Sequence, residues 1–87
     1  MSILTGNVTA EATACVLYRN TTYAFQQVTL TTHGNSADVY VGGHTVTPSS
    51  NGIVLAKSRT EHISVPPGAT LWCAGNGTDT VEYLTFG

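Results

Sequence analysis

Apolar and polar residues alternate along this chain in short runs, and clusters of Gly, Pro, Asn or Ser separate the runs. The runs are rich in Val, Thr, Ile and aromatic residues, which favour β-strands. No stretch keeps a 3.6-residue apolar period behind a helix cap, so no long helix is expected. In chain order the predicted strands are TACVLYR, AFQQVTLTT, ADVYV, HTVT, GIVLA, TEHISV, ATLWCA and DTVEYLTF.

The spacing of these runs predicts the fold class. Strands that recur about every ten residues indicate an all-β sandwich or barrel rather than βαβ units. We therefore expect a small antiparallel β-sandwich of the jelly-roll type with about seven or eight short strands. All 87 residues fit a single domain, 1–87. Residues 1–12, MSILTGNVTAEA, are expected to form an N-terminal arm or a first edge strand.

Two glycine-containing turns are specific enough to predict local geometry. Gly42 and Gly43 fit the central positions of a type I′ hairpin, where both residues need positive φ. Pro67 and Gly68 fit the central positions of a type II turn, in which Pro presets φ and Gly takes the positive value.

The predicted hairpin at Gly42 and Gly43 also fixes which side chains share a face. Val41 would pair with His44, and Val39 with Val46, because opposed residues of a hairpin point to the same side. The residues expected to point inward are Val39, Val41 and Val46, and those expected to point outward are Asp38, Tyr40, Thr45 and Thr47.

Several strands carry apolar residues on both faces. In ATLWCA, for example, Leu71 and Cys73 oppose Trp72. A chain of 87 residues has little material to cover both faces, so self-association is predicted. The basic cluster KSR is either a solvated turn or a contact with an acidic protein surface. The interface candidates are Tyr18, Trp72, Tyr83, Phe86, Lys57 and Arg59.

Charge excludes some classes of partner. Only 9% of the residues are charged, and the net charge is −2. Nucleic acid is not expected as a partner, because phosphate binding needs clustered Lys and Arg. No stretch reaches the apolar length of a membrane span, and the first residues lack the pattern of a secretory signal peptide. Synthesis in a bacterial cytoplasm is therefore expected.

The two cysteines, Cys15 and Cys73, lie far apart in the sequence and lack the spacing of a zinc site. Free cysteine often behaves as a small buried apolar residue, and a cytoplasmic chain keeps its thiols reduced. Two buried thiols are therefore favoured over a disulfide, which the sequence leaves open.

Catalytic and metal-binding patterns are not found in the sequence. His33, His44 and His62 fall in no ligand-like spacing, and Ser49 and Ser50 lie in a turn without a nucleophile-elbow motif. One remaining alternative is a metal site that collects one His per subunit around a symmetry axis. We expect neither an enzyme nor a cofactor or metal.

Residues 37–86 contain a strand VYVGG, a short strand TVT, an NG turn, a Pro-Gly turn and a last strand pair divided by a Gly-rich turn. In these features the segment resembles a small β-module of tailed-bacteriophage structural proteins. The resemblance implies a capsid decoration protein, a trimer on the virion surface that binds the major capsid protein and stabilises the shell. A freestanding short chain suits this role, and residues 1–12 would then form an arm on the capsid or on a neighbouring subunit.

The sequence also leaves two other functions open. The first is a phage tail, neck or fibre component, which carries a similar module. The second, from a different class, is a carbohydrate-binding adhesion module that uses exposed aromatic platforms. The aromatic residues available for such platforms are Trp72, Tyr18, Tyr23, Tyr40 and Tyr83.

Overall fold

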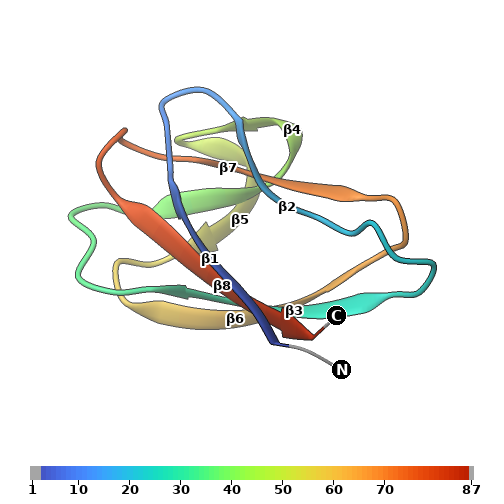
Figure 1. Cartoon of the computed structure of the whole chain (residues 1–87). Coiled ribbons are helices and arrows are strands. Elements are labelled where there is room, and N and C mark those ends of the chain that lie inside the picture. Colours follow the sequence, from blue (N-terminus) through green and yellow to red (C-terminus); the bar gives the residue numbers. More distant parts are fainter. Residues whose placement is uncertain (1–2, 87) are drawn as a thin grey trace.

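The computed structural model describes residues 3–86, which contain eight strands and no helix. Consequently no helix in the described part of the chain could span a membrane. Figure 1 shows the strands as two layers packed face to face. Their bounds are β1 (Ile3–Thr9), β2 (Cys15–Arg19), β3 (Gln26–Thr32), β4 (Val39–Thr47), β5 (Ser50–Leu55), β6 (Arg59–Val65), β7 (Thr70–Ala74) and β8 (Thr80–Phe86).

The strands form two four-stranded antiparallel sheets. One sheet, called the β1 sheet below, has the order β1-β8-β3-β6, and the other, the β2 sheet, has the order β2-β7-β4-β5. The chain crosses between the sheets after β1, β2, β3, β5, β6 and β7, which is the eight-stranded jelly-roll order. The predicted fold class, a small antiparallel β-sandwich of the jelly-roll type, is confirmed.

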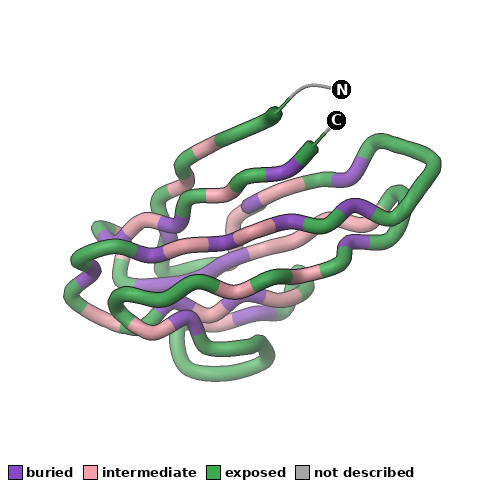
Figure 2. The backbone as a smooth tube through the Cα atoms, turned by 90° about the horizontal axis from the view of Figure 1, so that it is seen from below, coloured by how far each residue is buried: buried purple, intermediate pink, exposed green. Residues whose placement is uncertain are grey.

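The core lies between the two sheets and is built from small aliphatic side chains. Figure 2 shows buried positions recurring along the strands between exposed ones, as expected when one face of each sheet is covered. Burial of each Val or Leu side chain contributes about 1.5–3 kcal/mol. The apolar residues with at most 1% exposure include Val28, Leu30, Val39, Val41, Leu55, Cys73 and Val81.

The predicted hairpin turn at Gly42 and Gly43 is wrong. Both glycines lie inside β4, and neither is among the glycines with positive φ. The chain turns instead at Pro48 and Ser49, where Pro presets φ and the hydroxyl groups of Thr47 and Ser50 lie 2.8 Å apart. The Pro-containing turn therefore takes the place of the expected glycine turn.

A bulge accounts for the side-chain directions around this turn. Residues 43–46 of β4 face Asn51 alone, because Gly42 pairs with Gly52 and Thr47 with Ser50. Asn51 has a φ of 63° and donates from Nδ2 to the Thr45 carbonyl at 3.2 Å, which braces the bulge. The bulge changes which side chains of β4 point inward, and Val46 is buried like Val39 and Val41. The predicted burial of these three residues is therefore confirmed, although the predicted pairing is wrong.

The role of Gly42 is to let two backbones approach. A Cβ atom at Gly42 would lie 2.8 Å from the Asn51 carbonyl oxygen, and one at Gly52 would lie 2.6 Å from that of Val41. Any side chain at these positions would push β4 and β5 apart.

The turn predicted at Pro67 and Gly68 is confirmed. Gly68 has a φ of +76°, and the Ala69 amide donates to the Pro66 carbonyl at 3.1 Å. These two features define a type II turn, which connects β6 to β7.

One buried carboxylate joins two loops at one end of the sandwich. Asp79, just before β8, accepts hydrogen bonds from the backbone amides of Ser36 at 2.9 Å and Ala37 at 2.8 Å, and from Asn76 Nδ2 at 3.0 Å. These donors, chiefly the Ser36 amide, hold the pKa of Asp79 below its ordinary value. The ionised carboxylate therefore anchors the β3–β4 connection to the β7–β8 connection.

The N-terminal segment forms the edge of the β1 sheet. Residues Ile3–Thr9 pair along their whole length with β8, from Ile3 opposite Phe86 to Thr9 opposite Thr80. Residues 1–12 were expected as an arm or an edge strand, and Met1 and Ser2 of that segment lie outside the described residues. In the described part, the segment is an edge strand followed by a crossing loop.

Candidate functional site

Each sheet has two edges with unpaired backbone groups, and two of these four edges carry charges. On β6, Arg59 and Glu61 form an ion pair at 2.8 Å. On β2, Arg19 is exposed and the pairing with β7 shifts register between Val16 and Tyr18. Charged side chains are a usual means by which an edge strand avoids pairing with another chain, and charge is what separates these two edges from β5, whose pairing with β4 is also bulged. The β6 and β2 edges are therefore protected.

The other two edges, β1 and β5, have neither charge nor proline. Their sequences are ILTGNVT and SNGIVL, and both strands are largely exposed. Ile3 is 63% exposed and Leu4 43%, while Ile53 is 48% and Val54 43% exposed. We call β1 and β5 the uncharged edges. An uncharged strand edge with exposed aliphatic side chains is a template for pairing with another strand.

The uncharged edges lie on opposite flanks of the sandwich. β1 is at one end of its sheet and β6 at the other, and β5 lies against β6 at the second flank. A contact between β1 of one copy and β5 of another would join two different surfaces, and contacts of that kind repeat into rings or open filaments.

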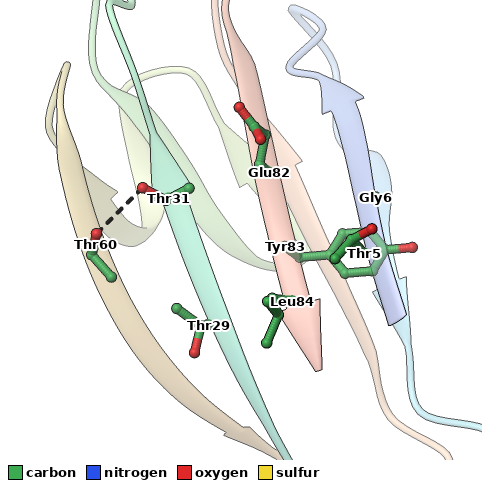
Figure 3. Close-up of a pocket in the computed structure, with 8 residues that line it drawn as sticks. All are labelled: Thr5, Gly6, Thr29, Thr31, Thr60, Glu82, Tyr83 and Leu84. Atoms are coloured by element: carbon green, nitrogen blue, oxygen red, sulfur yellow. Dashed lines mark hydrogen bonds between the residues drawn. The ribbon is translucent and has the colours of Figure 1, made fainter. Parts of the chain in front are cut away.

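Apolar surface continues from the β1 edge onto β8. Phe86 lies opposite Ile3 and Leu84 opposite Thr5, and both β8 side chains are exposed on the outer face of the sheet. Leu84 borders a shallow hollow of about 360 Å³. Figure 3 shows the residues that line it, which are Thr5, Gly6, Thr29, Thr31, Thr60, Glu82, Tyr83 and Leu84.

The surface that lines this hollow is mainly apolar, and four of its eight residues are threonines. Thr31 and Thr60 are hydrogen-bonded to each other at 3.3 Å, and Thr29 Oγ1 lies 3.1 Å from Nδ1 of His62 on β6. His62 Nδ1 thus has a hydroxyl partner. Among residues 3–86, no group of three His, Cys, Asp or Glu side chains is placed to hold a metal ion. The hollow therefore offers apolar contact bordered by hydroxyl groups.

The predicted interface residues fall in three places. Phe86 is 51% exposed beside the β1 edge, and Trp72 is half-buried on the outer face of the β2 sheet, in line with exposed Val16. Tyr18 and Tyr83 point between the sheets, where their rings pack in a tilted arrangement with centroids 5.2 Å apart and an interplanar angle of 56°.

The two basic residues of the predicted interface lie near the β5–β6 turn. Lys57 and Arg59 are both exposed, and the Arg59 guanidinium is paired with Glu61. The structure therefore does not bring the six predicted residues together into one surface. The uncharged edges were missed, although the absence of charge from ILTGNVT and SNGIVL was visible in the sequence.

The two cysteines meet across β2 and β7. Cys15 lies opposite Cys73 in the antiparallel register, and the two Sγ atoms are 3.5 Å apart as free thiols. The pairing of β2 with β7 therefore brings together two residues that are 58 positions apart in the sequence.

Comparison with known proteins gives one informative likeness. Neither a family model nor a curated protein matches the chain. A solved structure of Bacillus endospore appendages, described as a novel family of disulfide-linked pili, superposes with a TM-score of 0.67 and 19% identity. It covers 97% of this chain and 80% of that chain. In its fold, this chain resembles a pilus protein. At this identity the likeness establishes the fold alone.

This likeness corrects the expectations drawn from the phage resemblance. The module expected from residues 37–86, the role as a capsid decoration protein and the location on a virion are wrong, because the matching structure is a bacterial spore appendage. The resemblance depended on short strands and turns, which β-sandwiches of unrelated function can share. One supporting feature, the VYVGG segment followed by a separate TVT strand, is a single bulged strand in the structure.

Proposed function

We propose that this chain is a structural subunit that self-assembles into a filament of a bacterial surface appendage, and that it is not an enzyme. The observation that carries the proposal is the pair of uncharged edges, β1 and β5, on opposite flanks of one sandwich. Pairing β1 of one copy with β5 of the next would extend the sheets from subunit to subunit without using the charged edges.

The energetics of such pairing are favourable on both sides of the contact. Antiparallel or parallel addition would satisfy backbone N–H and C=O groups that now face solvent. It would also cover Ile3 and Leu4 on β1 and Ile53 and Val54 on β5, at about 25 cal/mol per Å² of apolar area removed from water. A net charge of only −2 opposes this association weakly.

The fold comparison supports the same proposal. The matching appendage structure is described as pili, and the superposition covers nearly the whole of this chain. A protein described as forming pili therefore shares this fold, and this chain carries two uncharged sheet edges at which copies could pair.

The first test is the state of the purified full-length chain. Light scattering after size exclusion and negative-stain electron microscopy should show species much larger than the 9.1 kDa monomer, in the form of filaments. The variant Ile3→Lys places a charge on the β1 edge and should abolish them. The matched control is Ser64→Lys on the charged β6 edge of the same sheet, which should leave filaments intact. A wild-type chain that stays monomeric at high concentration would overturn the proposal.

A further inference from the structure

The two cysteines occupy a geometry that suits a covalent bond within one chain. Directly opposed residues of antiparallel strands have Cα atoms about 4.5–5.5 Å apart, which lies within the range that a disulfide bridges. Cys15 and Cys73 are opposed in this way, and their sulfur atoms already lie 3.5 Å apart. Side-chain rotation can therefore close the remaining gap without moving either strand.

The two thiols differ in their access to solvent. Cys15 is partly exposed at the start of β2, where its Sγ contacts the Thr9 carbonyl at 3.4 Å. Cys73 is fully buried on β7. Burial, followed by the neighbouring Cys15, raises the pKa of the Cys73 thiol. A reagent from solution can therefore reach Cys15 directly, whereas Cys73 is shielded from solvent and protonated.

We infer that Cys15 and Cys73 are a redox-active pair that forms an intrachain disulfide between β2 and β7 on contact with a low-molecular-weight disulfide. This inference does not depend on filament assembly, since it uses residues inside a single subunit. It also differs from a bond between copies, because buried Cys73 faces Cys15 of its own chain.

The reaction has two balanced steps. First, the Cys15 thiolate attacks one sulfur of the small disulfide, which leaves a mixed disulfide on Cys15 and releases one small thiolate. Next, Cys73 gives up its proton and attacks the Cys15 sulfur, expelling the second small thiolate. The two protein thiols lose two electrons and two protons in total, and the small disulfide is reduced to two thiols.

The distribution of basic residues makes the bond easy to detect. Trypsin cleaves after Arg19, Lys57 and Arg59, the three basic residues of the chain, so Cys15 and Cys73 fall in separate peptides, 1–19 and 60–87. The full-length chain is incubated with excess oxidised glutathione under native conditions, and remaining thiols are then alkylated in denaturant. Intact mass spectrometry and a non-reducing digest follow.

The expected result is a monomer lighter by two hydrogens, with no alkylation and with peptides 1–19 and 60–87 joined. Three results would overturn the inference: two alkylated thiols, a glutathione adduct on Cys15 that persists, or joined peptides found only in covalent dimers.

A matched variant tests whether the joined peptides come from the native cysteine pair or from disulfide exchange after the chain is denatured. The double variant Cys15→Ser with Val16→Cys moves the thiol by one residue, to the exposed outer face of β2. It should stop at the glutathione adduct. Formation of the joined peptides in this variant as readily as in the wild type would also overturn the inference, because the opposed geometry would then be irrelevant.

Discussion

The ring of Tyr83 lies over Gly6, its partner on the neighbouring strand, in the space that a Cβ atom at residue 6 would occupy. Figure 3 shows this ring reaching from β8 toward β1. The ring also packs against that of Tyr18, whose hydroxyl donates to the Gln26 side chain. Gly6 is therefore needed for packing between β1 and the core.

The first prediction concerns this packing. The variant Gly6→Ala should lower the free energy of unfolding by about 1–3 kcal/mol, because the new methyl group displaces a ring that Tyr18 holds in place. Urea denaturation measures the change. The matched control is Gly43→Ala, since a Cβ atom there meets nothing within 4 Å. Equal stability of the two variants would show that the Tyr83 ring moves aside freely.

The second prediction concerns acid. Hydrogen bonds to the carboxylate hold the pKa of Asp79 below its ordinary value of 3.8, so its contribution to stability is complete above that pH. It should be lost as the pH falls through the lowered pKa. Thermal unfolding between pH 7 and pH 2 should show a steep decline for the wild type and a shallower one for Asp79→Asn.

Exposed Asp38 provides the control for this measurement. The variant Asp38→Asn should follow the wild-type curve, because Asp38 lies at the surface and accepts none of the loop hydrogen bonds. A decline of the same steepness in all three proteins would remove Asp79 as the acid-sensitive anchor.

The third prediction concerns the stability of the oxidised chain. A disulfide between residues 58 positions apart restricts the unfolded chain, and the chain-entropy relation gives about 4 kcal/mol of stabilisation. The oxidised protein should therefore unfold at a higher urea concentration than the reduced protein. Cys15→Ser should show no such dependence on oxidant. A lower midpoint after oxidation would mean that closing the bond strains β2 or β7.

The sequence was sufficient to predict the sandwich, most of the strands and the Pro67–Gly68 turn, but it divided β4 into two strands and left β1 as either an arm or an edge strand. These features depend on local chemistry, such as alternating burial and the fixed φ of proline. It was insufficient at Gly42 and Gly43, because a glycine pair serves equally in a turn and in a close approach of two strands. The turn forms at Pro48 and Ser49 instead, and this choice depends on how β4 and β5 pair, which the local sequence does not specify.

The candidate site was harder to predict than the fold. Alternation along a strand does not say which face is inward, so Tyr83 was expected at an interface although its ring lies in the core. Edge strands are defined by the order of strands in the sheets, which the sequence pattern does not contain. The meeting of Cys15 and Cys73 likewise follows from the register of β2 on β7.

The fourth prediction is a test of the two-edge assembly by complementation. The variant Ile3→Lys blocks the β1 edge and keeps β5, while Val54→Lys blocks the β5 edge and keeps β1. Ile3 is 63% exposed and Val54 is 43% exposed, so a charge at either position should be tolerated by the monomer. Neither variant alone should elongate, because every filament contact needs one intact edge of each kind.

The most direct measurement of the central claim is therefore the mass of an equimolar mixture of these two variants, determined by light scattering. The account predicts that each variant alone is a monomer and that the mixture forms a complex of two chains that grows no further. Filaments from either variant alone, or a mixture that stays monomeric while the wild type polymerises, would contradict pairing of β1 with β5.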